Sequence, residues 1–583
     1  MQGINARLKD LKSDESEFLD FFPENYTKGN YHYIFITGGV YSSVGKGIFA
    51  GALGHLLQSY GFNVTIIKME GYLNIDSGTI NPFRHGEVFV LEDGTESDLD
   101  LGNYERYLNK NLTQDNFITA GKIYSRVLEK ERQGEYLGRD VLVIPHLTGE
   151  IKNAWRRKAQ SMSTSSQTIV LLEIGGTVGD YENLIFIEAA RQMKLEEGEE
   201  NVLFFHVTPI LYNDKSEEFK TKPSQHSVRA LMELGIQPNF VVCRTKEQLP
   251  TRVKEKVSLY CNIPMERVLE SPDVISTYLI PSILNKQNII RLLETKLKFP
   301  YRSYTDQIID SFETYAKSLL TIKNEGHKIT IIIAGKYVNN VDSYLSIAHS
   351  LEHAGVANNV TVRIKYIDTE AVESSNTENF GKLLSRADGI IVPGGFGKRG
   401  LEGKIKVVKY ARENKIPYLG LCLGFQVALI EFARNVCGIN KAQTTESNPN
   451  TPEPVIYLLP TQANIDQIGG SMRLGAHKVK LHPFSTSKVM ELYLKDEILE
   501  RFRHRYEFNK KYQEIFEKEG IHFVGKTPDG KINQIFELDQ NIHPYYIGTQ
   551  FHPEFLSRPK NPHPLFFGLV KAAIERENKQ QED

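Results

Sequence analysis

Short runs of β-branched and other apolar residues recur along the chain, and each is followed by a segment with helical spacing. In the first half these runs are Tyr33–Thr37, Val64–Lys68, Val141–Pro145, Ile169–Glu173, Val202–Val207 and Phe240–Arg244. In the second half they are Lys328–Ala334, Val360–Tyr366, Gly389–Val392, Pro417–Leu421 and Tyr546–Gln550. Strands that alternate with helices are typical of parallel sheets covered by helices on both faces. The pattern therefore predicts two doubly wound α/β domains.

A mostly polar stretch without strand patterns separates the two series and is interpreted as a linker with helical spacing. The expected organisation is a polar extension over residues 1–30, domains over 31–299 and 327–575 joined by the linker 300–326, and a polar tail over 576–583. The extension favours a short helix around Phe18–Phe22. It has neither the apolar core of a secretory signal nor the arginine content of a transit peptide.

Composition and charge narrow the function classes only slightly. The 583 residues are 40% hydrophobic and 24% charged, which is ordinary for a globular protein. Lys and Arg number 70 against 72 Asp and Glu, so no overall basic excess indicates a nucleic-acid partner. The four cysteines are too scattered for a disulfide framework, and no apolar run approaches the roughly 18 residues that span a bilayer. We expect a cytoplasmic protein.

The first predicted strand leads into a glycine-rich loop, Gly38–Gly47, and then into a predicted helix over Ile48–Tyr60. Backbone N–H groups of such a loop can surround a polyphosphate, and Lys46 can reach the terminal phosphates. The loop departs from the Walker A pattern, because one extra residue separates its glycines and Gly47 replaces the hydroxyl residue that would bind Mg²⁺. A glycine-rich strand-to-helix turn with an incidental lysine is the alternative interpretation.

If this loop binds a nucleotide, carboxylates elsewhere must hold the metal. The candidates are Asp98 and Asp100, in an acidic run that begins at Glu96, and Glu173 at the end of a predicted strand. Ligands of α/β sheets gather at the carboxyl ends of the strands. For Glu96 and Asp98 a solvated face is the simpler interpretation, whereas Glu173 directly precedes a Gly-Gly-Thr turn and is interpreted as functional.

The second half of the chain carries a candidate nucleophile. Cys422 follows the strand Pro417–Leu421 and has Gly420 and Gly424 on its two sides. Small neighbours permit a tight strand-to-helix turn that places a thiol at a helix N-terminus, where the thiolate is favoured. Taken alone, Cys422 could equally be a core residue. The other cysteines, Cys243, Cys261 and Cys437, have no such neighbours and are interpreted as packing residues.

A base and an orienting carboxylate follow further along the chain. His552 can deprotonate Cys422, and Glu554 can orient His552, which is the arrangement that thioester chemistry requires. Pro393–Gly397, directly after another predicted strand, offers free backbone N–H groups to an oxyanion.

These motifs resemble the CTP synthase family. The segments that resemble its synthetase domain are Tyr33–Val40 with Ser42–Gly47, His85–Val90, Asp98–Gly102, Glu173–Asp180 and Lys220–Ser227. The segments around Gly394, Cys422 and His552 resemble the class I glutamine amidotransferase domain, and the likeness extends from about residue 31 to residue 575. The resemblance implies ATP-dependent amination of UTP to CTP through a 4-phosphorylated UTP, with ammonia taken from glutamine.

The resemblance also implies site residues in the first domain. Those implied for ATP are Ser43, Val44, Gly45, Lys46, Gly47, Lys68 and Asp100, and those implied for Mg²⁺ are Asp100 and Glu173. Those implied for UTP, and for CTP as an inhibitor, are Ser42, Asp180, Glu182, Lys220, Lys222, Gln225 and Lys256. Taken alone, Lys220 and Lys222 fit a solvated loop equally well.

For the second domain, the resemblance implies that the Gly395 and Leu423 amides form the oxyanion hole. Those implied for glutamine are Gly394, Gln426, Glu446 and Arg505. His85 and Val88 would lie near the synthetase end of an ammonia path, and Arg473 would contact GTP, the family's activator. The family also implies homotetramers and filaments.

The chain departs from the family pattern mainly near the pyrimidine. The departures are Glu70, Gly71, Ser77, Arg84, Leu142, Tyr181 and Ile185. The family usually has Gln in place of Leu142, so an amide near the base is lost. Two alternatives therefore stay open. One is a paralogous ATP-dependent ligase that amidates a related substrate, and the other is a non-catalytic assembly protein, against which both retained chemical sites argue.

Overall fold

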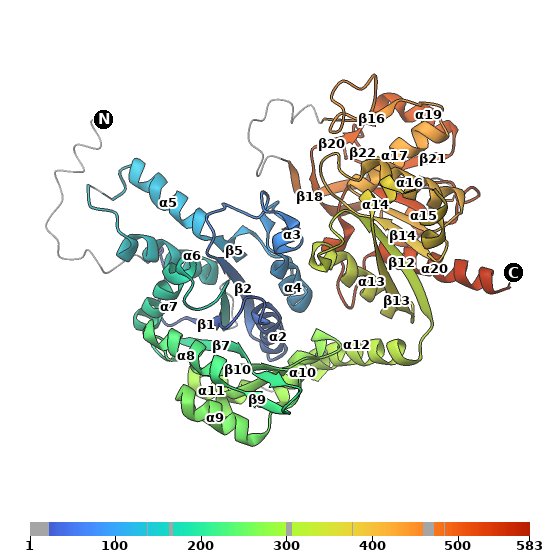
Figure 1. Ribbon diagram of the computed structural model, residues 1–583. Coiled ribbons are helices and arrows are strands. Elements are labelled where there is room, and N and C mark those ends of the chain that lie inside the picture. Colours follow the sequence, from blue (N-terminus) through green and yellow to red (C-terminus); the bar gives the residue numbers. More distant parts are fainter. Residues whose placement is uncertain are drawn as a thin grey trace. The chain divides into compact units, whose positions relative to one another are not determined.

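The computed structural model describes residues 22–136, 138–162, 167–298, 306–375, 377–458, 472–482, 484 and 486–582. The chain forms two compact units (Figure 1), one of residues 1–76 and 103–316, the other of residues 77–102 and 317–583. The segment 77–102, which the sequence places in the first domain, thus packs with the second unit. The helix expected around Phe18–Phe22 falls almost wholly outside the described residues.

The sheet of the first unit has the strand order β11-β10-β7-β1-β6-β2-β5, and its neighbouring strands are parallel. The strands are β1 (Tyr31–Gly38), β2 (Asn63–Glu70), β5 (Phe117–Thr119), β6 (Thr168–Ile174), β7 (Val202–Pro209), β10 (Phe240–Thr245) and β11 (Val268–Pro272). A separate hairpin joins β8 (Leu211–Asn213) to β9 (Glu218–Lys220). Fully buried β-branched runs form the central strands, as the pattern predicts.

Helices cover both faces of this sheet. They are α2 (Lys46–Ser59), α5 (Ala120–Arg132), α6 (Thr148–Ser161), α7 (Leu184–Glu197), α8 (Lys222–Glu233), α9 (Thr251–Cys261), α10 (Ile280–Lys286) and α11 (Ile289–Leu297). On one face the ring of Phe35 in β1 packs against Trp155 of α6, and on the other Phe49 of α2 packs against Phe205 of β7. The predicted doubly wound fold is confirmed for this unit.

The strand expected over Val141–Pro145 is wrong. Residues Val143–Leu147 form a wide helical turn instead, and the side chains of Leu142, Val143 and Ile144 are about half exposed. An apolar β-branched run forms a strand only where a neighbouring strand accepts its hydrogen bonds, and here Pro145 also lacks a donor.

The second unit has a larger sheet with the order β13-β12-β14-β15-β23-β22-β21-β18-β19. The strands are β12 (Lys328–Gly335), β13 (Thr361–Asp368), β14 (Gly389–Val392), β15 (Tyr418–Leu421), β18 (Arg473–Leu481), β19 (Glu497–His504), β21 (Ile521–Lys526), β22 (Asn533–Leu538) and β23 (Tyr546–Thr549). The pairs from β13 to β23 are parallel, as predicted, but those from β23 onward are antiparallel. The sheet is therefore mixed.

The remaining strands of this unit lie outside that sheet. They are β16 (Ala442–Thr444), β17 (Glu453–Leu458) and β20 (Tyr506–Phe508), which pair with one another, and β3 (Phe89–Val90) with β4 (Glu96–Ser97). The main helices are α13 (Leu345–Ala357), α16 (Leu401–Glu413), α17 (Leu423–Asn435) and α20 (Pro564–Glu582). Shorter ones are α3 (Pro82–His85), α14 (Thr369–Ser374), α15 (Thr377–Leu384), α18 (Lys488–Tyr493) and α19 (Gln513–Lys518), while α4 (Leu99–Leu108) begins in this unit and ends in the first.

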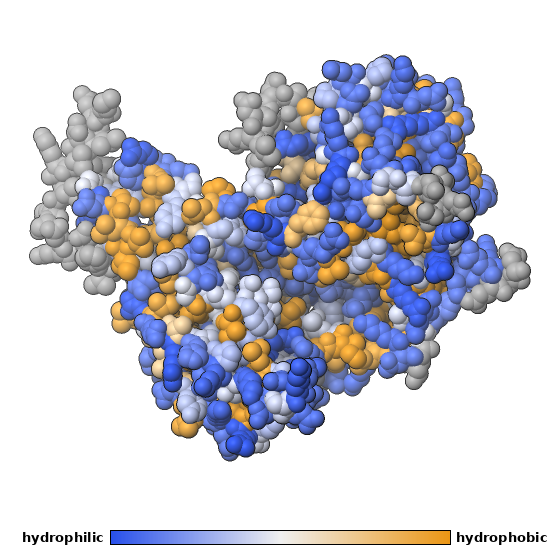
Figure 2. Space-filling model, viewed as in Figure 1, coloured by the Kyte–Doolittle hydropathy of each residue, from blue (hydrophilic) through white to orange (hydrophobic). Residues whose placement is uncertain are grey.

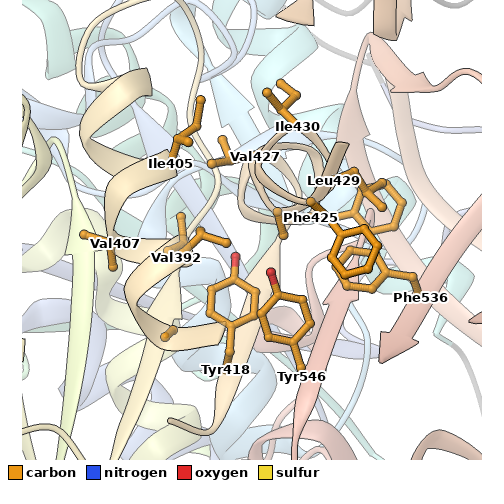
Figure 3. Close-up of a cluster of buried hydrophobic side chains, with 14 of the residues drawn as sticks. Val392, Ile405, Val407, Tyr418, Phe425, Val427, Leu429, Ile430, Phe536 and Tyr546 are labelled. Carbon is orange, nitrogen blue, oxygen red and sulfur yellow. The ribbon is translucent and has the colours of Figure 1, made fainter. Parts of the chain in front are cut away.

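The core beneath α16 and α17 fixes the start of α17. Figure 3 shows Phe425, Val427 and Leu429 of this helix among the side chains of that core. The rings of Tyr418 and Tyr546 stack with centroids 4.8 Å apart, on adjacent strands. A second core, on α13 and α20, covers the other face of the sheet.

The segment predicted as a linker with helical spacing contains one long helix, α12 (Asp306–Glu325). Its side chains Phe312 and Tyr315 are buried, and the Phe312 ring lies 4.0 Å from that of His55 in α2.

Among the described residues, no helix is long and apolar enough to cross a membrane.

Candidate active site

Cys422 stands on a tight turn between β15 and α17. Its backbone has φ 51° and ψ −99°, a strained combination for a residue with a side chain. A Cβ on Gly424 would lie 1.9 Å from the carbonyl oxygen of Val392, so only glycine fits there. The hydroxyl of Tyr418 donates a hydrogen bond to the Gly424 carbonyl at 2.9 Å and so stabilises the turn. The Gly-Leu-Cys-Leu-Gly sequence therefore places the thiol at the N-terminus of α17.

His552 and Glu554 come from the loop after β23 and meet Cys422 at this turn. A Cβ on Gly394 would lie 2.9 Å from His552 Cε1 and 3.6 Å from Cys422 Cβ, so both side chains converge on the same glycine. His552 Nδ1 and Glu554 Oε1 are 2.8 Å apart. Within the described residues, His552 Nε2 makes no hydrogen bond of standard geometry. This nitrogen is therefore the one available to the thiol.

The electrostatics of this trio favour a proton on the imidazole. Burial lowers the pKa of His552, but Glu554 and Cys422 outweigh burial and raise it to about 10. His552 can therefore keep a proton at neutral pH beside a thiolate. The predicted nucleophile, base and orienting carboxylate are thus brought together in a geometry that fits their predicted roles.

A cavity lies beside Cys422, His552 and Glu554, which all line it. The loop Pro393–Gly397 follows β14 and borders this cavity. Gly394 and Gly395 line this cavity together with the trio, and Leu423, the other predicted oxyanion residue, is the first residue of α17. Oxyanion donors must face the atom that develops charge. The structure brings the predicted loop to the thiol.

Of the four residues predicted to bind glutamine, one lines the cavity and three do not. Gly394 lines the cavity, whereas Gln426, Glu446 and Arg505 are not among its lining residues. Gln426 Nε2 donates to the carbonyl of Tyr506 at 2.7 Å, and a Glu446 carboxylate oxygen accepts the Gly397 N–H at 2.6 Å. Burial raises the pKa of Glu446. Of these three side chains, Glu446 contacts the loop whose residues Pro393–Phe396 line the cavity.

Segment 77–102 forms another wall of the cavity, and one of its residues makes a contact that the sequence did not predict. Val88 lines the cavity, but His85 does not and is exposed. Arg503 also lines it: its carbonyl oxygen lies 3.5 Å from Cys422 Sγ, and its Nε donates to Glu96 Oε1 at 2.7 Å. Glu96 is 1% exposed. The interpretation of Glu96 as part of a solvated face is therefore wrong, because an arginine far along the chain pairs with it.

In the first unit, the glycine-rich loop ends at Lys46, the first residue of α2. Gly45 has φ 98°, which favours glycine, and Lys46 is buried. Lys46 Nζ donates to the carbonyl of Gly176, just after β6, at 2.7 Å. The helix begins two residues earlier than predicted. The loop thus holds a buried ammonium group at the carboxyl end of the sheet.

Carboxylates surround a second lysine at the same edge of the sheet. Lys68 and Glu173 are register partners on β2 and β6, and Lys68 Nζ lies 2.8 Å from Glu173 Oε1 and 3.3 Å from Glu70 Oε1. The hydroxyl of Tyr104 donates to the other oxygen of Glu173. Glu70 and Tyr104 were not predicted as site residues, although Glu70 ends a strand as Glu173 does.

The donor set fits Mg²⁺ only together with a nucleotide. Mg²⁺ is commonly held by one or two carboxylates and by substrate phosphates. Among the described residues, no group of three or more His, Cys, Asp or Glu side chains gathers as a metal site. Glu173 supplies suitable oxygens in the first unit, whereas Asp100 belongs to the other unit.

The residues predicted for UTP follow the carboxyl ends of neighbouring strands, where α/β sheets bind ligands. Asp180 and Glu182 follow β6, the residues from Lys220 to Gln225 follow β7, and Lys256 follows β10. Asp180 accepts the Thr177 N–H at 2.7 Å, and Gln225 donates to the Thr221 hydroxyl at 3.0 Å. The other members of the set are exposed; they are Ser42, Glu182, Lys220, Lys222 and Lys256.

Comparisons with known families agree with both halves of this arrangement. The family described as CTP synthase N-terminus matches residues 32–299, and the family described as glutamine amidotransferase class-I matches residues 339–572. The glutaminase domain of Trypanosoma brucei CTPS with bound acivicin is 35% identical and aligns with 42% of this chain and 94% of its own, with a TM-score of 0.40.

Relatives named CTP synthase match nearly the whole chain. The one from Caldanaerobacter subterraneus subsp. tengcongensis is 49% identical over 542 residues, which is 93% of this chain and 98% of the relative. Those from Methanocaldococcus jannaschii and Bacillus subtilis are 49% and 46% identical, over 93% and 94% of this chain and 98% and 99% of the relatives. With this identity over this length, the chain belongs to the CTP synthase family.

Proposed function

We propose that the protein is a glutamine-hydrolysing CTP synthase, a C–N ligase that aminates UTP with ATP and glutamine. The observation that carries the proposal is the convergence of Cys422, His552 and Glu554 beside the Pro393–Gly397 loop. It occurs in a chain that matches CTP synthases over 93% of its length. The glycine-rich loop and its buried lysine supply the second chemical site.

In the glutaminase half, His552 takes the thiol proton and Cys422 attacks the carboxamide carbon of glutamine. The Gly395 and Leu423 amides stabilise the oxyanion, and Glu554 keeps the imidazole oriented. As this oxyanion collapses, the carboxamide nitrogen takes a proton from His552 and leaves as ammonia, and a glutamyl thioester remains. Water then hydrolyses the thioester to glutamate, and the thiol is regenerated.

In the synthetase half, Lys46 and Lys68 orient the ATP phosphates and balance the charge of the moving phosphoryl group. Glu173 would hold Mg²⁺ together with the phosphates, with Asp100 proposed on resemblance alone, and the ion would supply further charge neutralisation. The oxygen at position 4 of UTP attacks the terminal phosphorus of ATP and ADP leaves. Ammonia then displaces phosphate from position 4, because a phosphorylated oxygen is a far better leaving group than a carbonyl oxygen.

Ammonia must reach the synthetase half before it is protonated, since ammonium is not a nucleophile. Val88 supports a protected route, because it lines the cavity that also contains Cys422. His85 is proposed for the same route on resemblance alone.

Regulation and assembly follow the family. GTP would activate the enzyme, with Arg473 as one contact, and CTP would inhibit at the UTP site. A homotetramer, which in turn builds filaments, is supported by apolar surface in the first unit. Figure 2 shows apolar side chains gathered around α5, and the exposed side chains Leu142, Val143 and Ile144 add to the apolar surface of this unit.

Leu142 favours a second candidate, a paralogue that aminates a related substrate. If the substrate is UTP, Leu142→Gln is expected to raise kcat/KM for UTP by up to about fivefold to tenfold. One added hydrogen bond is worth on the order of 1 kcal/mol. Steady-state kinetics with varied UTP measure the effect, and Val143→Gln, next to it and equally exposed, is the matched control. An unchanged or lower value would show that the pocket has compensated.

The proposed function is tested by product analysis. The protein is incubated with UTP, ATP, Mg²⁺ and glutamine, and each is omitted in turn. CTP, ADP, phosphate and glutamate are expected in equal amounts, with CTP absent from every reaction that lacks a substrate. ATP and glutamine turnover with another pyrimidine but not with UTP would support the paralogue instead. Absence of both turnovers would support an assembly protein.

A further inference from the structure

Two lysines contact the oxyanion loop around Gly395. Lys336 follows β12, and its Nζ donates to the carbonyl of Phe396. Lys404 lies in α16 with its side chain fully buried, and its Nζ is 3.5 Å from the carbonyl oxygen of Pro393. A Cβ on Gly395 would lie 3.5 Å from both Lys336 Cε and Lys404 Nζ. The two lysines thus contact loop carbonyls before and after Gly395 in the sequence.

The contacts between the lysines and the loop carbonyls also orient the amides of the loop. In a trans peptide the C=O and N–H point in opposite directions. A Pro393 carbonyl that faces Lys404 therefore turns the Gly394 N–H away from the lysine. Lys404 thus fixes the peptide before Gly394, which is next to the Gly395 amide that is the proposed oxyanion donor, in a loop that lines the cavity with Cys422.

Lys404 is also an unusual buried charge. Within the described residues, the Pro393 carbonyl is the hydrogen-bond acceptor of its Nζ, and no carboxylate bonds to it. The charged and titratable groups around it are Lys336 after β12, Cys422 at the start of α17 and Glu446 after β16. Burial, reinforced by Lys336, lowers the pKa of Lys404 to about 7 against the opposing effect of Cys422 and Glu446. A buried unpaired ammonium destabilises the fold, so a functional gain is expected in return.

We infer that Lys404 is a positioning residue of the glutaminase reaction, which holds the Pro393–Gly397 loop and places a positive charge behind the thiolate and the oxyanion. The inference rests on the proposed function. The protonated lysine strengthens both effects, because a cation attracts the loop carbonyl and stabilises nearby negative charge. Its contribution therefore declines as pH rises through 7.

The test compares Lys404→Met, which keeps the length of the side chain and removes the charge, with wild type. Lys409→Met, an exposed position on the same helix, is the matched control. At pH 6, kcat/KM for glutamine hydrolysis is expected to fall by about tenfold to a hundredfold in Lys404→Met, less than the loss of a direct oxyanion donor. Ammonia-dependent synthesis should stay within about twofold, since chemistry in the other half is untouched. Lys409→Met should resemble wild type in both.

The pH dependence separates this role from a structural one. The ratio of wild-type to Lys404→Met kcat/KM should shrink from pH 6 to pH 8.5, because wild type loses the charge in that interval. Taking the ratio cancels every other titrating group that the two proteins share. A loss of packing would lower activity equally at all pH values, so a constant ratio would overturn the inference.

Stability gives an independent readout. The unfolded chain binds the Lys404 proton more tightly than the folded one, so this lysine costs stability below pH 7. The Tm of Lys404→Met at pH 6 should therefore equal or exceed that of wild type. A lower Tm, or unchanged glutamine hydrolysis, would contradict the inference. If Lys404→Met does not fold, Lys404→Gln takes its place at both pH values, and a constant ratio of wild-type to Lys404→Gln kcat/KM would overturn the inference.

The failure of this inference is distinguishable from failure of the proposed function. Wild type that does not hydrolyse glutamine would contradict the proposed function itself. Wild type that hydrolyses glutamine, with Lys404→Met equally active, would contradict only the role of Lys404.

Discussion

Cys422→Ala is expected to abolish CTP synthesis from glutamine while synthesis from ammonium salt persists. The thiol is the atom that bonds to the glutamine carbon, and its removal leaves Lys46, Lys68 and Glu173 in the other unit untouched. Loss of a covalent nucleophile typically costs several orders of magnitude in kcat. Activity with ammonium should rise with pH, because the free amine is the attacking species. CTP formation at saturating ATP and UTP, with each nitrogen source in turn, measures both rates.

Cys437→Ala is the matched control, because Cys437 is a partly buried thiol packed against the core under α17. It should keep both activities. Retained glutamine-dependent synthesis in Cys422→Ala would exclude Cys422 as the nucleophile. Loss of both activities in a folded protein would show that the two halves depend on each other more closely than the account allows.

Lys46→Ala should have the converse effect and abolish synthesis from either nitrogen source. Lys46 Nζ is buried at the end of the glycine-rich loop and donates to the Gly176 carbonyl, where it can turn to a phosphate. Removing a cation from a phosphoryl-transfer site commonly costs about 10²-fold to 10³-fold. Basal glutamine hydrolysis should remain largely intact. CTP and glutamate, measured in the same reactions, report the two halves separately.

Lys296→Ala, in α11 and outside every predicted site, is the control and should change neither rate. CTP formation at the normal rate by Lys46→Ala would contradict the assignment of the glycine-rich loop to the ATP site. Equal loss of hydrolysis and synthesis would instead indicate a folding defect, which the melting temperature would reveal.

Most of the parallel strands were predictable because they are buried on both faces and read as continuous apolar runs, whereas β13 at the sheet edge is only partly buried. Tyr33–Thr37 and Lys328–Ala334 are such runs, and both lie within central strands. The antiparallel strands of the second unit were missed because polar residues alternate along them, as in Arg473–Leu481. Val141–Pro145 has the composition of a strand but pairs with no strand in the described part of the chain, and composition alone does not reveal a pairing strand.

The nucleophile, base and carboxylate were predictable because each stands in a local motif next to a strand end. The contacts of Glu96 and Lys404 were not, because they depend on residues brought close only by folding. Glu96 belongs to an acidic run that looks solvated, yet Arg503 pairs with it in the same unit. Nothing local to Lys404 distinguishes it from the other lysines of its helix, whereas its burial behind Pro393 does.

We expect one chain to take nitrogen from glutamine at Cys422 and to place it on UTP. Tracing that nitrogen follows the whole transfer. The enzyme is incubated with UTP, ATP, Mg²⁺, GTP and glutamine labelled with ¹⁵N in its amide, beside unlabelled ammonium at neutral pH, and CTP is analysed by mass spectrometry. The account predicts CTP that carries ¹⁵N on its exocyclic amine, and unlabelled CTP from Cys422→Ala. Unlabelled CTP from wild type, or labelled CTP from Cys422→Ala, would contradict it.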